Sequence, residues 1–135
     1  MIEFFLPMKK VPTATHQQTK VTCKDGKPIH YEPNNLKKAR ADYIALLSRY
    51  VPDKPLDGPL QLTTKFLFAY PKSWPKSKRT TTWKDTKPDN GNANKLLEDV
   101  MEELGFYKND SQIASLIIQH FWAEPTGIYI KLEKL

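Results

Sequence analysis

Three residues in the second half of the chain have types and spacing that could do chemistry together: Asp89, Lys95 and Asp110. Asp89 precedes a helical pattern, Lys95 falls in its first turns, and Asp110 follows its end. Two converging carboxylates offer the oxygen ligands that Mg²⁺ prefers, and this ion keeps several of its waters. Beside a phosphodiester, such an ion polarises a phosphoryl oxygen and activates water, while a lysine offsets the charge that develops. We therefore expect metal-assisted phosphodiester chemistry if the chain folds back beyond Gly105.

The same residues have ordinary structural explanations. An aspartate before a helix is commonly its N-cap. Asp110 with Ser111 could form a plain turn leading into a strand, and Lys95 with Asp99 could form an i,i+4 ion pair. The three residues alone leave the catalytic and the structural interpretations open.

The elements that would position these residues follow from hydrophobic periodicity. Apolar residues at helical spacing predict a helix from about Asn92 to Leu104, which Gly105 would cap. Alternating segments predict two strands after it, SQIASLIIQHFWA and GIYIKLEKL. The preceding chain predicts a strand over Ile2–Met8, a hairpin at Asp25-Gly26, a helix capped by Asn34 or Asn35, and a strand in LQLTTKFLFAY. This order indicates an α+β fold: a single domain over 1–135, with one mixed β-sheet and two helices packed against it.

Composition narrows the class of protein. The chain has 135 residues, a net charge of +6 and a single cysteine, Cys23, so no internal disulfide can form and a cytoplasmic location is expected. No apolar run approaches the roughly 20 residues of a membrane span, so no membrane association is expected. The N-terminal MIEFFLPMKK does not have the charge order of a secretory signal. The positive charge makes a polyanion such as DNA a plausible partner.

Positive charge is concentrated in the segment PKSWPKSKRTTTWKDTKP, hereafter the basic arm (residues 71–88). The tryptophans Trp74 and Trp83 are interleaved with its cations, and the arm is too long for a structureless connection in a compact domain unless it is functional or mobile. A solvated loop is the simpler reading. A DNA contact, with rings that stack on bases or wedge a branch point, is the alternative. The predicted DNA-binding residues are Lys72, Lys76, Lys78, Arg79, Lys84 and Lys87.

The order of residues around the helix resembles the RusA family of Holliday junction resolvases. The matching positions are Asp89, Asn92, Lys95, Asp99, Gly105-Phe106, Asp110 and Gln112-Ile113. The resemblance implies a small homodimeric endonuclease, common in prophages, that nicks four-way DNA junctions symmetrically in recombination and repair. It also implies Asp89, Lys95 and Asp110 as catalytic residues, with Asp89 and Asp110 holding Mg²⁺, for which Mn²⁺ could substitute.

Two departures from the family pattern bear on activity. Gly91 stands where the family has its second catalytic aspartate, and Asn109 replaces the first acid of an Asp-Asp pair. The first change removes a negative charge on which affinity for a divalent ion depends. Asn90 or Asn92 could supply a neutral oxygen, or Glu98 or Asp99 could approach from the helix. The remaining alternative is a protein that binds junctions but cuts them weakly or not at all.

The histidines and the cysteine are weaker candidates. His16 and His30 lie near the hairpin and are expected to be solvated. His120 lies in a predicted strand beside Phe121 and Trp122, where packing is expected instead of chemistry. Cys23 has no partner cysteine for a zinc site.

Overall fold

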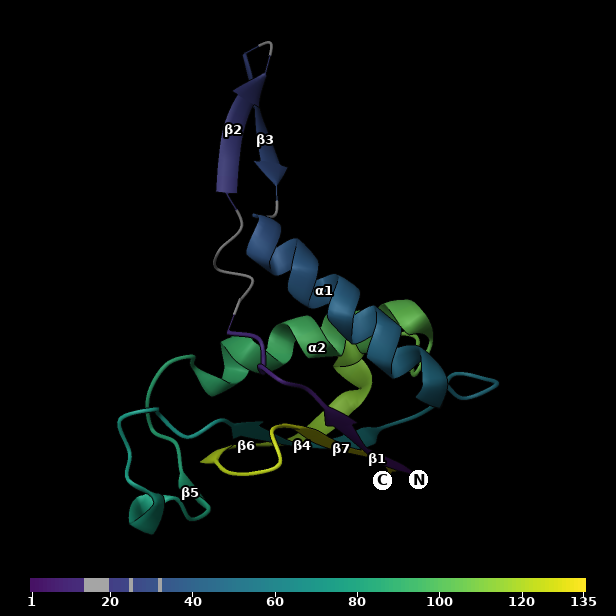
Figure 1. Cartoon of the computed structure of the whole chain (residues 1–135). Helices are drawn as coiled ribbons and strands as arrows, with labels where there is room; N and C mark the ends of the chain where they lie inside the picture. The colour runs from purple at the N-terminus through teal and green to yellow at the C-terminus, as the bar shows by residue number, and fades with distance from the viewer. Residues whose placement is uncertain (14–19, 25, 32) are drawn as a thin grey trace.

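The computed structural model describes residues 1–13, 20–24, 26–31 and 33–135. A mixed five-stranded sheet with the strand order β1-β7-β4-β6-β5 forms its base, and two helices lie over one face (Figure 1). The strands are β1 (Ile2–Pro7), β4 (Leu60–Phe68), β5 (Thr82–Trp83), β6 (Ile113–Trp122) and β7 (Gly127–Lys134). The helices are α1 (Asn34–Leu47) and α2 (Asn90–Leu104). The predicted α+β class with two helices against one mixed sheet is confirmed.

The sheet owes its mixed character to one parallel pair. β4 runs parallel to β6, whereas the pairs β1–β7, β4–β7 and β5–β6 are antiparallel. A parallel pair needs a long crossover, and the basic arm together with α2 provides it between β4 and β6. The crossover brings the chain after α2 back alongside the helix. This return is the condition under which the sequence predicted that Asp110 could join the site.

Alternation in the strands separates a buried face from an open face. In β4 the residues Leu60, Leu62, Thr64, Phe66 and Phe68 are buried, while the side chains that alternate with them are partly or fully exposed. The buried face packs against apolar stripes of both helices. The helical stripes are Leu36, Ala39, Tyr43 and Leu47 in α1, and Leu96, Leu97, Val100 and Met101 in α2.

The helix ends differ slightly from expectation. α2 begins at Asn90, two residues earlier than predicted, because Asp89 caps it. Gly105 ends it in the left-handed conformation at φ 98°, and its N–H donates to the carbonyls of Met101 and Glu102. The predicted cap of α1 was wrong: the N-cap position is Pro33, which makes no side-chain cap, and Asn34 is already helical.

A second, two-stranded sheet stands apart from the first. β2 (Lys20–Lys24) pairs with β3 (Lys27–Tyr31), which confirms the predicted hairpin, and the hairpin extends beyond the first turn of α1 (Figure 1). The predictions for the side chains of His16, Cys23 and His30 lie outside the described part of the chain. No helix among the described residues is long and apolar enough to cross a membrane.

Candidate functional site

Helix α2 carries the residues predicted to do chemistry. Its N-cap Asp89 accepts a hydrogen bond from the backbone N–H of Asn92 at 3.2 Å through Oδ1. The next residue, Asn90, donates a hydrogen bond from its side chain to the carbonyl of Ile118 in β6 at 3.3 Å. The structural interpretation of Asp89 as a cap is therefore confirmed. Because its side chain is exposed and a cap uses only part of its hydrogen-bonding capacity, the carboxylate stays open to other ligands.

Asp110 and Lys95 come together across the gap between α2 and the start of β6. Lys95 Nζ lies 3.1 Å from Asp110 Oδ2. Asp110 opens the turn η4 (Asp110–Gln112), and its backbone N–H donates to Glu102 Oε1 at 2.7 Å. The hydrogen bond that the Lys95 ammonium donates to Asp110 raises the pKa of Lys95, aided by the charges of Asp99 and Glu98. Lys95 is therefore held as a cation among acids.

A buried polar chain positions a further acid beside this pair. Thr64 Oγ1 in β4 donates to Asn94 Oδ1 at 2.7 Å, and Asn94 Nδ2 donates to Glu98 Oε2 at 2.8 Å. Thr64 and Asn94 are fully buried. Burial raises the pKa of Glu98, against the opposing effects of the Asn94 hydrogen bond and the charge of Lys95. Glu98 is thus fixed in place near Lys95 and Asp110.

Asp89 faces a different cleft. An open cleft lined by residues 84–90 includes its carboxylate, and the charge of Asp89 acts on His120. A Cβ added at Gly91 would lie 3.5 Å from Asp89 Oδ1, which is an ordinary van der Waals contact. A Cβ at position 91 therefore fits beside Asp89 without displacing the backbone.

The site is therefore in two parts along α2. Asp89 lies at the first turn, whereas Asp110 lies beside Lys95 and Glu102, and within the described residues no hydrogen bond or ion pair joins Asp89 to either Lys95 or Asp110. No group of three or more His, Cys, Asp or Glu side chains suited to a metal ion occurs in the parts of the chain that are described. That Asp89 and Asp110 share an ion stays a prediction.

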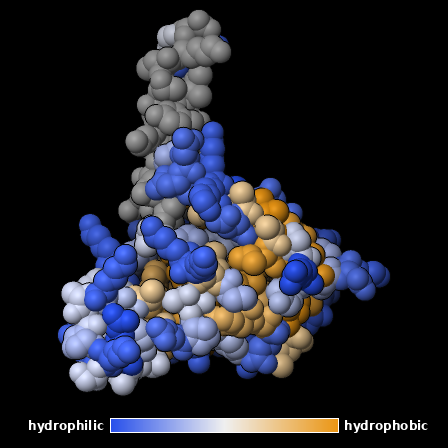
Figure 2. Space-filling model, viewed as in Figure 1, coloured by the Kyte–Doolittle hydropathy of each residue, from blue (hydrophilic) through white to orange (hydrophobic). Residues whose placement is uncertain are grey.

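The basic arm is ordered and fastened to the sheet. Trp74 packs against Trp122 of β6 with ring centroids 5.7 Å apart, and Lys78 Nζ lies 4.5 Å from the Trp74 ring centroid. The Arg79 guanidinium donates to the carbonyls of Trp74 and Lys72 and so braces the arm internally. In Figure 2 the surface around β5 combines blue, hydrophilic residues with pale residues of intermediate hydropathy. The predicted DNA contacts that project into solvent from this arm are Lys72, Lys76, Lys78 and Lys87.

Lys84 differs from the other predicted DNA-binding residues because the fold encloses it, and its contact with DNA stays a prediction. It is 9% exposed. Its ammonium donates to the Thr86 carbonyl at 2.9 Å, to Thr86 Oγ1 at 3.0 Å and to the Lys87 carbonyl. An ammonium has three donors, so none is left for a phosphate. Proximity in sequence to exposed cations does not reveal that Phe68 and Trp122 enclose this one.

Sequence reasoning also missed residues that the fold brings to the site. Lys9 and Lys10, after β1, line the same concave surface as Lys87, over a floor that includes Phe68 and Trp122. Nothing in the local sequence relates positions 9 and 87. The sequence could have identified Asn94 as a buried polar residue of the site. It lies at the spacing of the apolar stripe of α2, where a polar side chain needs a buried hydrogen-bond partner.

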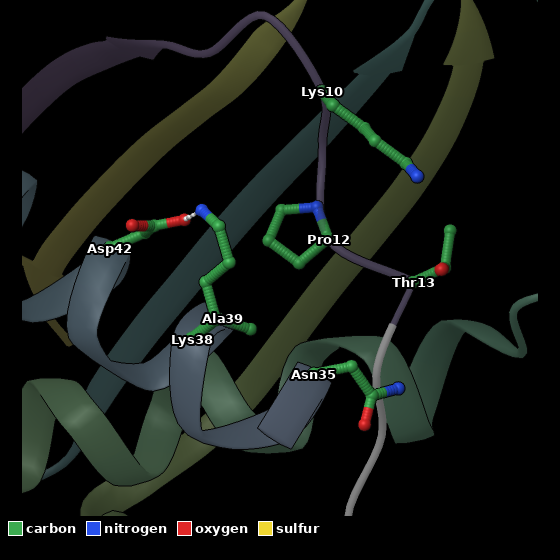
Figure 3. Close-up of a pocket in the computed structure, with 7 residues that line it drawn as sticks. All are labelled: Lys10, Pro12, Thr13, Asn35, Lys38, Ala39 and Asp42. Atoms are coloured by element: carbon green, nitrogen blue, oxygen red, sulfur yellow. Dashed lines mark hydrogen bonds and ion pairs between the residues drawn. The ribbon is translucent and has the colours of Figure 1, made fainter. Parts of the chain in front are cut away.

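A separate pocket of about 230 Å³ lies between the segment after β1 and helix α1 (Figure 3). Its charged pair, Lys38 and Asp42, form an i,i+4 ion pair at 3.0 Å on the helix, and Lys10 points away from them. The remaining lining residues shown in Figure 3 are Pro12, Thr13, Asn35 and Ala39. This pocket contains none of the residues predicted to do chemistry.

Comparison with known proteins agrees with the sequence pattern. The family model described as "Endodeoxyribonuclease RusA" matches residues 7–133. The chain is 30% identical over 138 residues to the protein named "Crossover junction endodeoxyribonuclease rusA" of Lactococcus phage r1t. That alignment covers 98% of this chain and 98% of the phage protein.

Proposed function

Because the chain belongs to the RusA family of endodeoxyribonucleases, we propose that it resolves four-way DNA junctions by paired symmetric nicks. The ion pair of Lys95 with Asp110 carries this proposal most directly, since it brings together two of the three predicted catalytic residues from segments on either side of a helix end. The phage relative supports a prophage origin and a role in recombination and repair, which we propose takes place in the cytoplasm.

The proposed cofactor is Mg²⁺, with Mn²⁺ as a substitute. Asp89 and Asp110 offer hard, ionisable oxygen donors, and Asp89 is exposed. Mg²⁺ is commonly held by only one or two carboxylates together with waters and substrate phosphate. A site that lacks a third acid in the free chain is therefore compatible with this ion, provided that the DNA completes it. When bound, Mg²⁺ would polarise the scissile phosphate and lower the pKa of the attacking water.

Lys95 would act on the phosphate itself. Its side chain is half exposed, and its ammonium forms an ion pair with Asp110. Three donors allow it to keep Asp110 while another N–H approaches a phosphoryl oxygen. Because the raised pKa of Lys95 keeps it charged, it can offset negative charge that accumulates on the phosphate in the transition state.

The DNA would lie across the basic arm. Exposed Lys72, Lys76 and Lys78 supply phosphate contacts, and Lys87 extends the positive surface to the turn before Asp89. Trp83 is 64% exposed and stacks on Phe121 with ring centroids 4.5 Å apart. A ring that packs on another ring through one face and is otherwise exposed is suited to stack on an unpaired base at a branch point.

A homodimer follows from the proposed reaction. Two nicks at symmetric positions on opposite strands need two active sites related by a two-fold axis. We propose that the active protein is therefore a symmetric dimer. Its molar mass in solution, measured by light scattering with and without a junction, tests this: a protein of 15.6 kDa in both states would contradict it.

A junction-binding protein without efficient cleavage is the second candidate, and Gly91 favours it. The test is a synthetic four-way junction incubated with Mg²⁺ or Mn²⁺ and either the unmodified protein or Gly91→Asp. Symmetric nicks by the unmodified protein would eliminate the binding-only function. Nicks by Gly91→Asp alone would establish it. Equal, weak binding to linear duplex and junction, with no nicks from either protein, would contradict both candidates.

A further inference from the structure

Lys84 occupies an unusual environment for a lysine. It is 9% exposed, and its ammonium lies 4.7 Å from the ring centroid of Phe68 and 4.9 Å from that of Trp122. Burial lowers its pKa, although the charge of Asp85 opposes this effect. Its hydrogen-bond acceptors are all neutral oxygens of the next three residues. A buried cation that has no ion-pair partner among the described residues contributes little to general stability, because an apolar side chain of similar size commonly stabilises the fold as well.

The oxygens that Lys84 binds lie in the turn that leads to Asp89. Two belong to Thr86 and the third is the carbonyl of Lys87, two residues before Asp89. The backbone of Lys84 is itself fastened to the sheet, since its N–H donates to the carbonyl of His120 in β6 at 3.0 Å. One residue thus joins β6, the aromatic floor and the turn.

Asp89 is consequently tethered to β6 from both sides. Lys84 holds the preceding turn against His120, and Asn90 donates to Ile118 in the same strand at 3.3 Å. A carboxylate must stay within a fraction of an ångström of its productive position, and misplacement by about 1 Å can reduce a rate about 100-fold. The turn has no other side-chain hydrogen bond to hold it among the described residues.

We propose that Lys84 is a positioning residue that fixes the turn 85–88 and thereby holds the Asp89 carboxylate in its productive position at the cleavage site. Its relevance to cleavage rests on the proposed function, but its effect on the turn does not. Lys84 touches neither the DNA nor the metal in this role. Its loss should therefore lower the rate of cleavage and leave the affinity for the junction unchanged.

The test compares Lys84→Met with the matched control Lys65→Met. Lys65 is an exposed lysine on β4, 5.4 Å from the ring centroid of Tyr129, so both variants remove one charge beside an aromatic ring. Hydrogen–deuterium exchange of residues 85–92, single-turnover cleavage and junction affinity are measured for each. We expect Lys84→Met alone to exchange faster over 85–92 and to cleave about 10- to 100-fold more slowly, with junction affinity within about threefold of the unmodified protein.

Unchanged exchange over 85–92 would overturn the proposal, as would a loss of affinity as large as the loss of rate. If Lys84→Met does not fold, Thr86→Val removes one acceptor of the ammonium and should give a smaller change in the same direction. If the unmodified protein does not cleave, the proposed nuclease function fails, while the exchange measurement still decides whether Lys84 holds the turn.

Discussion

His120 should make the protein sensitive to mild acid. Its side chain is 3% exposed and lies between Phe66 and Phe68, with ring centroids 4.8 and 5.3 Å away. Neither ring nitrogen has a hydrogen-bond partner among the described residues. Burial, reinforced by the positive charge of Lys84, lowers the pKa of His120 from 6.5 to about 4, although the charge of Asp89 opposes this. The expected packing role of this residue is confirmed.

The sign and size of the effect follow from linkage. Because the folded protein disfavours the imidazolium, the unfolded chain binds the proton first as the pH falls below 6.5. The stability contributed by neutral His120 is therefore present above pH 6.5 and is lost as the pH falls towards 4. Between pH 7 and pH 5 the free energy of unfolding falls by about 2 kcal/mol because of this residue. For a chain of this length, that fall corresponds to a decrease of about 7 °C in Tm.

The assay is urea unfolding at pH 7 and pH 5, comparing the unmodified protein with His120→Phe. Other groups that titrate in this range contribute equally to both proteins. The difference between the two decreases in the free energy of unfolding, from pH 7 to pH 5, therefore gives the contribution of His120. We expect this decrease to be about 2 kcal/mol smaller for His120→Phe than for the unmodified protein. An NMR titration of the ring provides the direct check. A pKa near 6.5, or equal acid sensitivity of the two proteins, would refute the reasoning.

Three further predictions concern the proposed nuclease. Gly91→Asp should lower the Mg²⁺ concentration needed for half-maximal cleavage, because it adds a carboxylate on a Cβ that would lie 3.5 Å from Asp89 Oδ1; an unchanged Mg²⁺ titration would contradict this. Trp83→Ala should weaken junction binding about 5- to 100-fold in fluorescence anisotropy while the Tm changes little, whereas full affinity would exclude base stacking by this ring. The double variant Lys76→Ala with Lys78→Ala should reduce the slope of log K against log salt concentration by about two, and an unchanged slope would remove both lysines from the phosphate contacts.

Local signals explain why much of the fold was predictable. Gly105 and the apolar spacing of α2 fixed the end and the buried face of that helix. Alternation located the strands β4, β6 and β7, and the Asp-Gly dipeptide located the hairpin. These features depend on residues a few positions apart. The resemblance to a family added the roles of Asp89, Lys95 and Asp110, of which the structure brings the last two into contact.

Features that depend on distant contacts were not predictable. The burial of Lys84 requires Phe68 and Trp122, which come from the strands β4 and β6. The approach of Lys9 to Lys87 likewise depends on how the segment after β1 crosses the sheet. No local pattern distinguishes an enclosed lysine from a solvated one within a basic segment, so Lys84 was assigned with its neighbours.

The most direct test of the central claim is single-turnover cleavage of a four-way junction with Mg²⁺ by the unmodified protein, Asp89→Asn and Asp110→Asn. The central claim is that the two carboxylates act together on one phosphodiester. We predict symmetric nicks by the unmodified protein and a loss of at least about 100-fold in rate for each variant, with junction binding retained. Cleavage at the full rate by either variant would contradict the claim.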